Sequence, residues 1–582
     1  MASFMSNLNP VPTLPEYTGP YKVGTVDVEI PVSELASPSP TPDGAADIET
    51  VLFRIFYPCV PESRGKRITW LPAPQRLHIA AYAQFLGLGS PLASILSFLP
   101  RHLHWTTIPA QKNATLLDPT SGNPSPRWPV MIFSHGLGGN RNAYSHLAGS
   151  MASYGVVAIC PEHRDRSAVL SLIRAPESQQ KRSGVKATRH VVPYSQIPHD
   201  QTHEVWEARN KQLRIRLWEL GLIFEALMAI DRGDEAIIKS NLNKSTLEAA
   251  LSQFSGKLDV LDPGKVIFAG HSFGAATVVQ LVKSTYYRNH PSVSSMAAPL
   301  FTPTENGAIT RQITPHTPTI LLDMWCFPLL SASTSALYNL PLPCYSRSAQ
   351  PAMPSPPPGG NAVLAIESAH FFSWTEHLHA KARILSADPS STSSTPDEPA
   401  KRGPIPQQPH FFYVEHSAHL SQSDFGVLFP WLTGKLCGST QPERVLRLNV
   451  RAQLQFLREN GVVVAGTARG DLVDGLGITG GDERNGEEVK GEGNDKWVDR
   501  DEGILRKDGG VDAWKWIDIC GLLGDGEYPS EGDMSRETEG GESAEAVRAE
   551  EGEKEMQAEI EPSLEAAVEG KLAEAGREVL GA

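Results

Sequence analysis

A serine between two glycines is the feature that most constrains how this chain can fold. Residues 266–270 form an apolar run typical of a buried strand, and a run compatible with a helix begins at Phe273. Ser272 therefore lies on the turn between a strand and a helix, with Gly270 and Gly274 two residues away on either side. Because the turn is so tight, a side chain at either glycine would collide with the neighbouring strand or helix. The pattern predicts that the Ser272 hydroxyl is held at the carboxyl edge of a sheet.

Segments typical of strands and helices alternate up to about residue 460. Further strands are expected at residues 23–32, 51–57, 129–133, 155–159, 319–322, 362–366 and 411–414. Further helices are expected at residues 142–154, 205–230 and 442–460. Strands that alternate with helices in this way indicate an α/β fold with a mostly parallel central sheet flanked by helices.

Composition divides the chain into three regions. Residues 1–17 are expected to be a flexible lead, residues 18–460 the main domain, and residues 461–582 an acidic, Gly- and Glu-rich tail that is mostly disordered. Pro- and Ser-rich stretches at about 330–360 and 386–408 indicate surface insertions in the main domain. The formal net charge of -14 argues against nucleic acid as a partner.

The six cysteines are scattered, without C-x-x-C pairs or metal-type spacing, so we expect free buried thiols. The first ten residues lack the basic and apolar blocks of a secretory signal, which favours a cytoplasmic protein. The apolar segment 76–105 is interrupted by Gly87, Gly89 and Pro91 and is too short to span a bilayer. No transmembrane segment is therefore expected.

Within that segment, residues 92–99 place Leu92, Ile95, Leu96 and Leu99 on one helical face. This face could pack in the core of the domain. It could instead dip into a lipid surface beside the active site, which would make the protein peripheral to membranes. The residues alone leave both interpretations open.

A serine hydroxyl is a poor nucleophile at neutral pH, so Ser272 would need a histidine base and a carboxylate that orients this base. With this kind of turn, the order along the chain is serine, acid, histidine. Asp323 is the favoured acid because it directly follows the expected strand 319–322. The carboxylates with weaker placement are Glu305, Glu367, Glu376, Glu415 and Asp424.

Two histidines compete for the role of the base. His416 follows the expected strand 411–414 by only two residues, whereas His419 lies farther into the loop that must reach over Ser272. We therefore favour His419. A tetrahedral intermediate also needs two N–H donors for its oxyanion. The favoured donors are the backbone N–H groups of Phe273, after the serine, and of Leu137, in the His-Gly-Leu-Gly-Gly loop.

Five segments together resemble the platelet-activating factor acetylhydrolase family, the serine-dependent, calcium-independent group VII phospholipases A2 and their fungal relatives. These segments are residues 19–24, 133–138, 162–167, 270–274 and 322–329, and the resemblance covers roughly residues 17–435. It implies an α/β-hydrolase fold. It also implies a catalytic triad and oxyanion donors at the positions favoured above, namely Ser272, Asp323 and His419 with Leu137 and Phe273. The family's histidine is followed by an Asp-Phe pair, which residues 424–425 supply if the base is His419.

The resemblance further implies hydrolysis of the acetyl or short or oxidised acyl ester at the sn-2 position of a phospholipid, as in a 1-alkyl-2-acetylglycerophosphocholine esterase. The reaction would pass through an acyl-enzyme and need no metal or cofactor. The family is also expected to meet lipid surfaces through an apolar helix, which favours the lipid interpretation of residues 92–99. Two alternatives stay open: a general carboxylesterase or polyester hydrolase on the same fold, and a catalytically silent scaffold that binds partners. The segment 162–166, Glu-His-Arg-Asp-Arg, is expected to form a buried ion network without a catalytic role.

Overall fold

The computed structural model describes most of the chain up to residue 524. The described residues are 14–87, 89, 101–121, 125–174, 189–346, 356–390, 408–430, 433, 441–472 and 496–524. The expected helix at 92–99, most of the insertion at 386–408 and residues 525–582 of the expected tail lie outside them.

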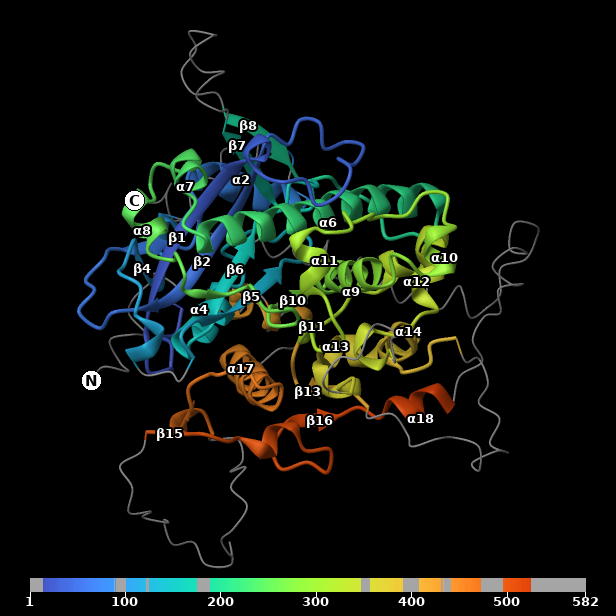
Figure 1. Cartoon of the computed structure of the whole chain (residues 1–582). Helices are drawn as coiled ribbons and strands as arrows, with labels where there is room; N and C mark the ends of the chain where they lie inside the picture. The colour runs from blue at the N-terminus through green and yellow to red at the C-terminus, as the bar shows by residue number, and fades with distance from the viewer. Residues whose placement is uncertain are drawn as a thin grey trace, which may run out of the picture.

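A twelve-stranded sheet runs through the domain (Figure 1). The strand order is β16-β13-β12-β11-β10-β5-β6-β2-β1-β4-β3, and β9 pairs with β5. All neighbours from β6 to β13 are parallel, whereas β2 joins β6, and β16 joins β13, in antiparallel fashion. The strands of this sheet are β1 (Lys22–Pro31), β2 (Thr50–Cys59), β3 (Arg67–Thr69), β4 (Thr107–Lys112), β5 (Trp128–Ser134), β6 (Val157–Pro161), β9 (Leu258–Asp259), β10 (Ile267–His271), β11 (Thr319–Leu322), β12 (Val363–Ser368), β13 (His410–Val414) and β16 (Trp514–Trp516).

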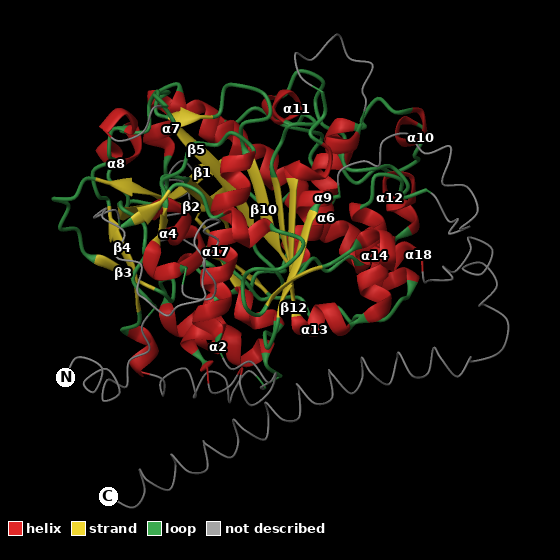
Figure 2. Cartoon of the chain, turned by 90° about the horizontal axis from the view of Figure 1, so that it is seen from below, coloured by secondary structure: helices red, strands yellow, loops and turns green. Residues whose placement is uncertain are grey.

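Helices cover both faces of the sheet (Figures 1 and 2). On one face, α6 (His203–Asp231) and α9 (Phe273–Tyr286) bury their apolar side chains in one core cluster. On the other face, α4 (Ser145–Ser153) and α17 (Pro442–Glu459) contribute to a second cluster. This arrangement confirms the α/β-hydrolase fold with a mostly parallel sheet.

Shorter elements connect and flank these layers. A separate hairpin consists of β7 (Leu170–Arg174) and β8 (Arg189–Pro193), and a second small pair consists of β14 (Thr467–Ala468) and β15 (Trp497–Val498). The remaining α-helices are α2 (Gln75–Phe85), α7 (Glu235–Ser240), α8 (Glu248–Ser252), α10 (Pro291–Ser294), α11 (Ala308–Gln312), α12 (Ser335–Tyr338), α13 (Ala369–Ser373), α14 (Thr375–Leu385), α15 (Asp424–Leu428) and α18 (Ile519–Gly524). None of the described helices combines the length and apolarity that crossing a bilayer requires.

The domain extends beyond the expected boundary at residue 460. Strand β16 adds to the edge of β13, and the ring of Trp514 stacks on Phe412 with centroids 5.2 Å apart. Asp501 forms a fully buried ion pair with Arg451 of α17. Residues 496–519, which we call the C-terminal segment, therefore belong to the main domain. The prediction failed because a few apolar residues pack here despite the Gly- and Glu-rich average, and Ile504 is fully buried.

Two other boundaries also differ from the expectation. Leu14 is buried, and the Tyr17 hydroxyl donates to the Ser145 carbonyl at 3.1 Å, so the lead does not reach residue 17 as an unpacked segment. In the Pro- and Ser-rich stretch after residue 330, Leu342 and Cys344 lie in the first core cluster. That part is packed into the domain because its apolar side chains fill space beside α9 and β12, and it is not a surface insertion.

Candidate active site

Ser272 lies at the turn between β10 and α9, in a backbone conformation with φ 55° and ψ -123°. Its backbone N–H donates to the Leu322 carbonyl at 2.9 Å, which ties the turn to the next strand. A Cβ at Gly270 would lie 2.5 Å from the carbonyl group of Gly274, and a Cβ at Gly274 would overlap the Ser134 carbonyl oxygen. The steric requirement for both glycines is thus confirmed.

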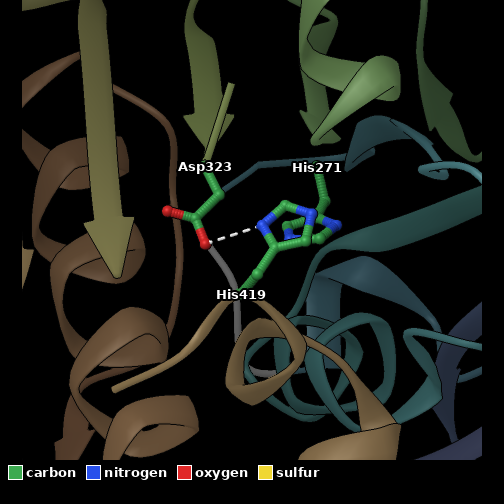
Figure 3. Close-up of side chains that lie close together, drawn as sticks. All are labelled: His271, Asp323 and His419. Carbon is green, nitrogen blue, oxygen red and sulfur yellow. Dashed lines mark hydrogen bonds and ion pairs between the residues drawn. The ribbon is translucent and has the colours of Figure 1, made fainter. Parts of the chain in front are cut away.

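Asp323 directly follows β11 and is fully buried. One of its carboxylate oxygens accepts the Ser368 N–H at 2.5 Å, and the other lies 3.0 Å from Nδ1 of His419 (Figure 3). Burial by itself would raise the pKa of Asp323, but the hydrogen bond and the charge of His419 hold this pKa below its ordinary value. An ionised carboxylate therefore fixes the orientation of the His419 imidazole.

Two rings pack against the ring of His419. That of Phe371, in α13, is stacked on it with ring centroids 4.3 Å apart and planes 3° from parallel. That of His271, the residue before Ser272, lies with its centroid 4.3 Å away and its plane tilted by 31° (Figure 3). The side chain of His419 remains 30% exposed, so the ring is held in place while one part of it faces solvent.

The competing candidates have other surroundings. His416 is exposed, and its backbone has φ 56°, so its side chain is not brought to Asp323. Glu367 is buried in an ion pair with Lys381. Asp424 accepts hydrogen bonds from the Trp70 indole and from the backbone and side chain at the start of α4. The other three candidate acids are exposed or half-buried: Glu305, Glu376 and Glu415.

The loop that follows β5 has one unused N–H group among its central residues. The Gly136 N–H donates to the Tyr144 hydroxyl, that of Gly138 to the Ser167 carbonyl, and that of Gly139 to the Gly136 carbonyl. The N–H of Leu137 donates to no described group. The same holds for the N–H of Phe273, which opens α9 and has no partner within the helix. These two groups are available to an oxyanion.

Tyr144 links this loop to the serine turn. Its hydroxyl accepts the Gly136 N–H at 3.2 Å and lies 2.7 Å from Nδ1 of His271. Burial, and secondly the nearby charge of His419, lower the pKa of His271 well below its ordinary value. His271 is therefore a neutral ring that supports His419 by packing against it.

The ligand atoms of His271, Asp323 and His419 lie within 4.8 Å of one another, close enough for a shared metal ion. Both oxygens of Asp323 already accept hydrogen bonds. On His271, Nδ1 is hydrogen-bonded to the Tyr144 hydroxyl, whereas Nε2 is buried without a partner among the described residues. The hydrogen-bonded pair therefore accounts for this cluster.

The segment 162–166 forms the buried ion network that the sequence predicts. Glu162 pairs with Arg141, Arg164 with Glu29, and Asp165 with Arg216. The contacts that Tyr144 and Phe371 make with the site residues were not predicted, since they join residues far apart in the sequence.

With this geometry in place, comparison with known proteins identifies the family. Residues 7–343 match the family described as "Platelet-activating factor acetylhydrolase, isoform II", which is more than half of the chain. The chain belongs to this family. Ser272 and Asp323 lie inside the matched range, whereas His419 lies beyond it.

Individual relatives are similar at low identity. A putative phospholipase A2 from Schizosaccharomyces pombe is 28% identical over 463 residues, which is 77% of this chain and 92% of that protein. The platelet-activating factor acetylhydrolase of Cavia porcellus is 29% identical over 271 residues, which is 46% of this chain and 52% of that protein. The match thus spans about half the length of the guinea pig relative. A ferulic acid esterase structure from Streptomyces cinnamoneus has 14% identity, covers 76% of this chain and 92% of that one, and has a TM-score of 0.42, too low to support a structural comparison.

Proposed function

We propose that this protein hydrolyses the acetyl or short or oxidised acyl ester at the sn-2 position of phospholipids. Family membership supports this substrate class, because relatives are named platelet-activating factor acetylhydrolase and putative phospholipase A2. The observation that carries the proposal is the 3.0 Å hydrogen bond between Asp323 and His419 beside the turn that presents Ser272.

In the proposed reaction, the Ser272 hydroxyl attacks the ester carbonyl while His419 accepts its proton. Nδ1 of His419 is occupied by Asp323, so Nε2 is the nitrogen that takes the proton. The Ser272 side chain makes no capping hydrogen bond to α9, which leaves its hydroxyl available to His419, and catalytic hydrogen bonds of this kind tighten when the substrate binds.

The N–H groups of Leu137 and Phe273 would bind the oxyanion of the tetrahedral intermediate. When this intermediate collapses, His419 gives its proton to the departing lysophospholipid, and the acyl group stays on Ser272. A water molecule, deprotonated by the same histidine, then attacks the acyl carbon. The bond from this carbon to Ser272 Oγ breaks, the fatty acid or acetate leaves, and His419 returns the proton to the Ser272 hydroxyl.

The test compares three substrates on the purified protein: a 1-alkyl-2-acetyl phospholipid, a phospholipid with a long sn-2 chain, and p-nitrophenyl acetate. We expect the highest kcat/KM for the short-acyl phospholipid. A preference for the simple soluble ester would instead indicate a general esterase, the alternative left open by the sequence.

Mutation of the proposed nucleophile tests the mechanism. Ser272→Ala should lower kcat by on the order of 10⁴ or more with an unchanged fold, and a fluorophosphonate probe should label only the wild-type protein. A wild-type protein that stays unlabelled would support the silent scaffold. Activity should persist in EDTA; inactivation by EDTA with recovery in calcium would contradict the oxyanion account.

Peripheral lipid contact through residues 92–99 is part of the same proposal and is supported by the spacing of the apolar residues in this stretch of sequence. Leu96→Glu with Leu99→Glu should weaken binding to phospholipid vesicles and spare hydrolysis of p-nitrophenyl acetate. Unchanged vesicle binding by the double variant would remove this contact from the proposal.

A further inference from the structure

One buried arginine contacts both segments that carry the candidate oxyanion donors. Arg216 lies in α6 and is fully buried. Its Nη1 donates to the His135 carbonyl at 2.8 Å, its Nη2 to the Ser167 hydroxyl at 2.6 Å, and its Nε to the Asp165 carboxylate at 2.9 Å. The guanidinium is therefore fixed in a plane by three separate partners.

These contacts hold the loop on both sides of Leu137. The His135 carbonyl, bonded directly to Arg216, opens the loop. Beyond Leu137, the Gly138 N–H donates at 2.9 Å to the carbonyl of Ser167, whose hydroxyl is bonded to Arg216. The peptide N–H of Leu137 thus lies between two anchors that share one guanidinium.

The same guanidinium also contacts the second candidate donor residue. Its central carbon lies 4.5 Å from the centroid of the Phe273 ring, a distance typical of a cation–π contact. Its Nη1 reaches the Thr277 hydroxyl, one turn along α9, at 3.4 Å. Arg216 therefore packs against the first turn of α9, where the Phe273 N–H has no hydrogen-bond partner among the described residues.

We propose that Arg216 is a positioning residue that sets the separation of the Leu137 and Phe273 N–H groups, and so assembles the oxyanion hole. The inference rests on the proposed serine mechanism. Stability alone does not explain the pair with Asp165, since buried ion pairs can often be replaced by apolar groups at little or no net cost. A lysine could not substitute, because a single ammonium lacks the fork that reaches three partners at once.

The test removes the arginine together with its partner, so that no unpaired carboxylate stays buried. Arg216→Met with Asp165→Asn should lower kcat about 100-fold with little change in KM, as expected when an oxyanion donor is displaced. Both acylation and deacylation pass through an oxyanion, so single-turnover experiments should show both steps slowed. The second-order rate of fluorophosphonate labelling should fall in parallel.

A matched control exists in the same chain. Arg451 and Asp501 form an equally buried pair, with Nε to Oδ2 at 2.7 Å, between α17 and the C-terminal segment. Arg451→Met with Asp501→Asn should destabilise the fold to a similar degree but keep kcat within about threefold of wild type. A kcat for the Arg216 double variant equal to that of this control, or a loss confined to KM, would overturn the proposal.

Arg216→Lys provides a second, milder variant if the double variant does not fold. It keeps the positive charge, and we expect kcat to fall at least about tenfold because one ammonium cannot hold both anchors. Wild-type kcat in this variant would contradict the inference. If the wild-type protein cleaves p-nitrophenyl acetate but no phospholipid, the substrate proposal fails while the Arg216 comparison remains valid on the soluble ester.

Discussion

Strand β13 borders two regions: the loop of the candidate base His419 and the pairing with β16 at the edge of the sheet. The first carries polar groups of the site, and the second contributes to stability. At its carboxyl end the chain leads into the loop of His419, where polar groups meet and the backbone is strained. Along its edge it pairs with β16 of the C-terminal segment, where apolar side chains and one ion pair are buried. His416 in this loop has φ 56°, and Ser272 and Asp323, which follow β10 and β11, have φ of 55° and 41°. Such conformations cost on the order of 1–3 kcal/mol each. The carboxyl ends of β10, β11 and β13 carry the candidate triad and are together called the catalytic end below. This end consumes stability that the edge between β13 and β16 helps to supply.

This difference predicts that variants at the catalytic end change kcat but leave the melting temperature unchanged. Variants along the edge should lower the melting temperature and leave kcat unchanged.

The largest effect should come from the candidate base. His419→Ala should lower kcat by on the order of 10⁴, and adding Ser272→Ala should cost little more, because members of a triad act as one unit. His416→Ala should cost less than about tenfold, about 1.4 kcal/mol of barrier. Steady-state kinetics on a soluble ester measure all three, with circular dichroism as the check on folding. The opposite ranking of the two histidines would assign the base to His416.

A chain that ends at Leu472 should be strongly destabilised. It loses the buried Trp514 and Ile504 and leaves Arg451 without Asp501, which together should lower the free energy of unfolding by on the order of 5 kcal/mol or more. Urea unfolding measures this change. A chain that ends at Gly524 keeps all of these contacts and is the control. Equal stability of the two truncated proteins would show that the C-terminal segment contributes nothing.

A single residue of the edge should show the same effect on a smaller scale. Trp514→Ala should lower the free energy of unfolding by about 3 kcal/mol, because it empties a buried site against Phe412, and kcat should stay within about threefold. Trp497→Ala, at a tryptophan that is 36% exposed, is the control and should cost far less. A large fall in kcat for Trp514→Ala would mean that the edge also positions the His419 loop.

The smallest effect expected is at Phe371, which stacks on the His419 ring. Phe371→Leu should lower kcat about tenfold, because the imidazole gains freedom to rotate, equivalent to about 1.4 kcal/mol of barrier. Phe372→Leu is the matched control, since Phe372 stacks on Tyr413 with centroids 3.8 Å apart and does not contact His419. Equal kcat values for the two variants would show that His271 and Asp323 suffice to hold the base.

The catalytic end was largely predictable because its chemistry leaves local signals in the sequence. The glycines around Ser272 are required by a turn of a few residues, and Asp323 and His419 each follow a recognisable strand. The fold was predictable for the same reason, since periodic apolar residues mark each strand and helix. The roles proposed for Ser272, Asp323 and His419 remain predictions until the experiments above are done.

The pairing of β16 with the edge of β13 was not predicted because the apolar pattern of β16 is short. It also lies in a Gly- and Glu-rich region whose average composition indicates disorder. Averaging over residues 461–582 hides Ile504 and the alternating Trp514-Lys515-Trp516, which together would have indicated a strand. Arg216 was missed for another reason. The sequence of α6 shows a pattern of apolar residues, whereas a buried guanidinium is recognised only when its partners, 49 to 82 positions away, are in place.

The strand order also determines how long β13 waits for its partner strand β16 while the chain is being synthesised. Val414 at the end of β13 pairs with Trp514, which leaves the ribosome 100 residues later. At typical elongation rates this takes about 5–20 s, during which the apolar edge of β13 has no partner strand. An open edge can pair with another nascent chain, so this interval is a period of exposure to aggregation and to chaperones. Without the C-terminal segment, the edge of β13 would stay unpaired. The yield of soluble protein should then fall even at temperatures at which the truncated domain is still folded.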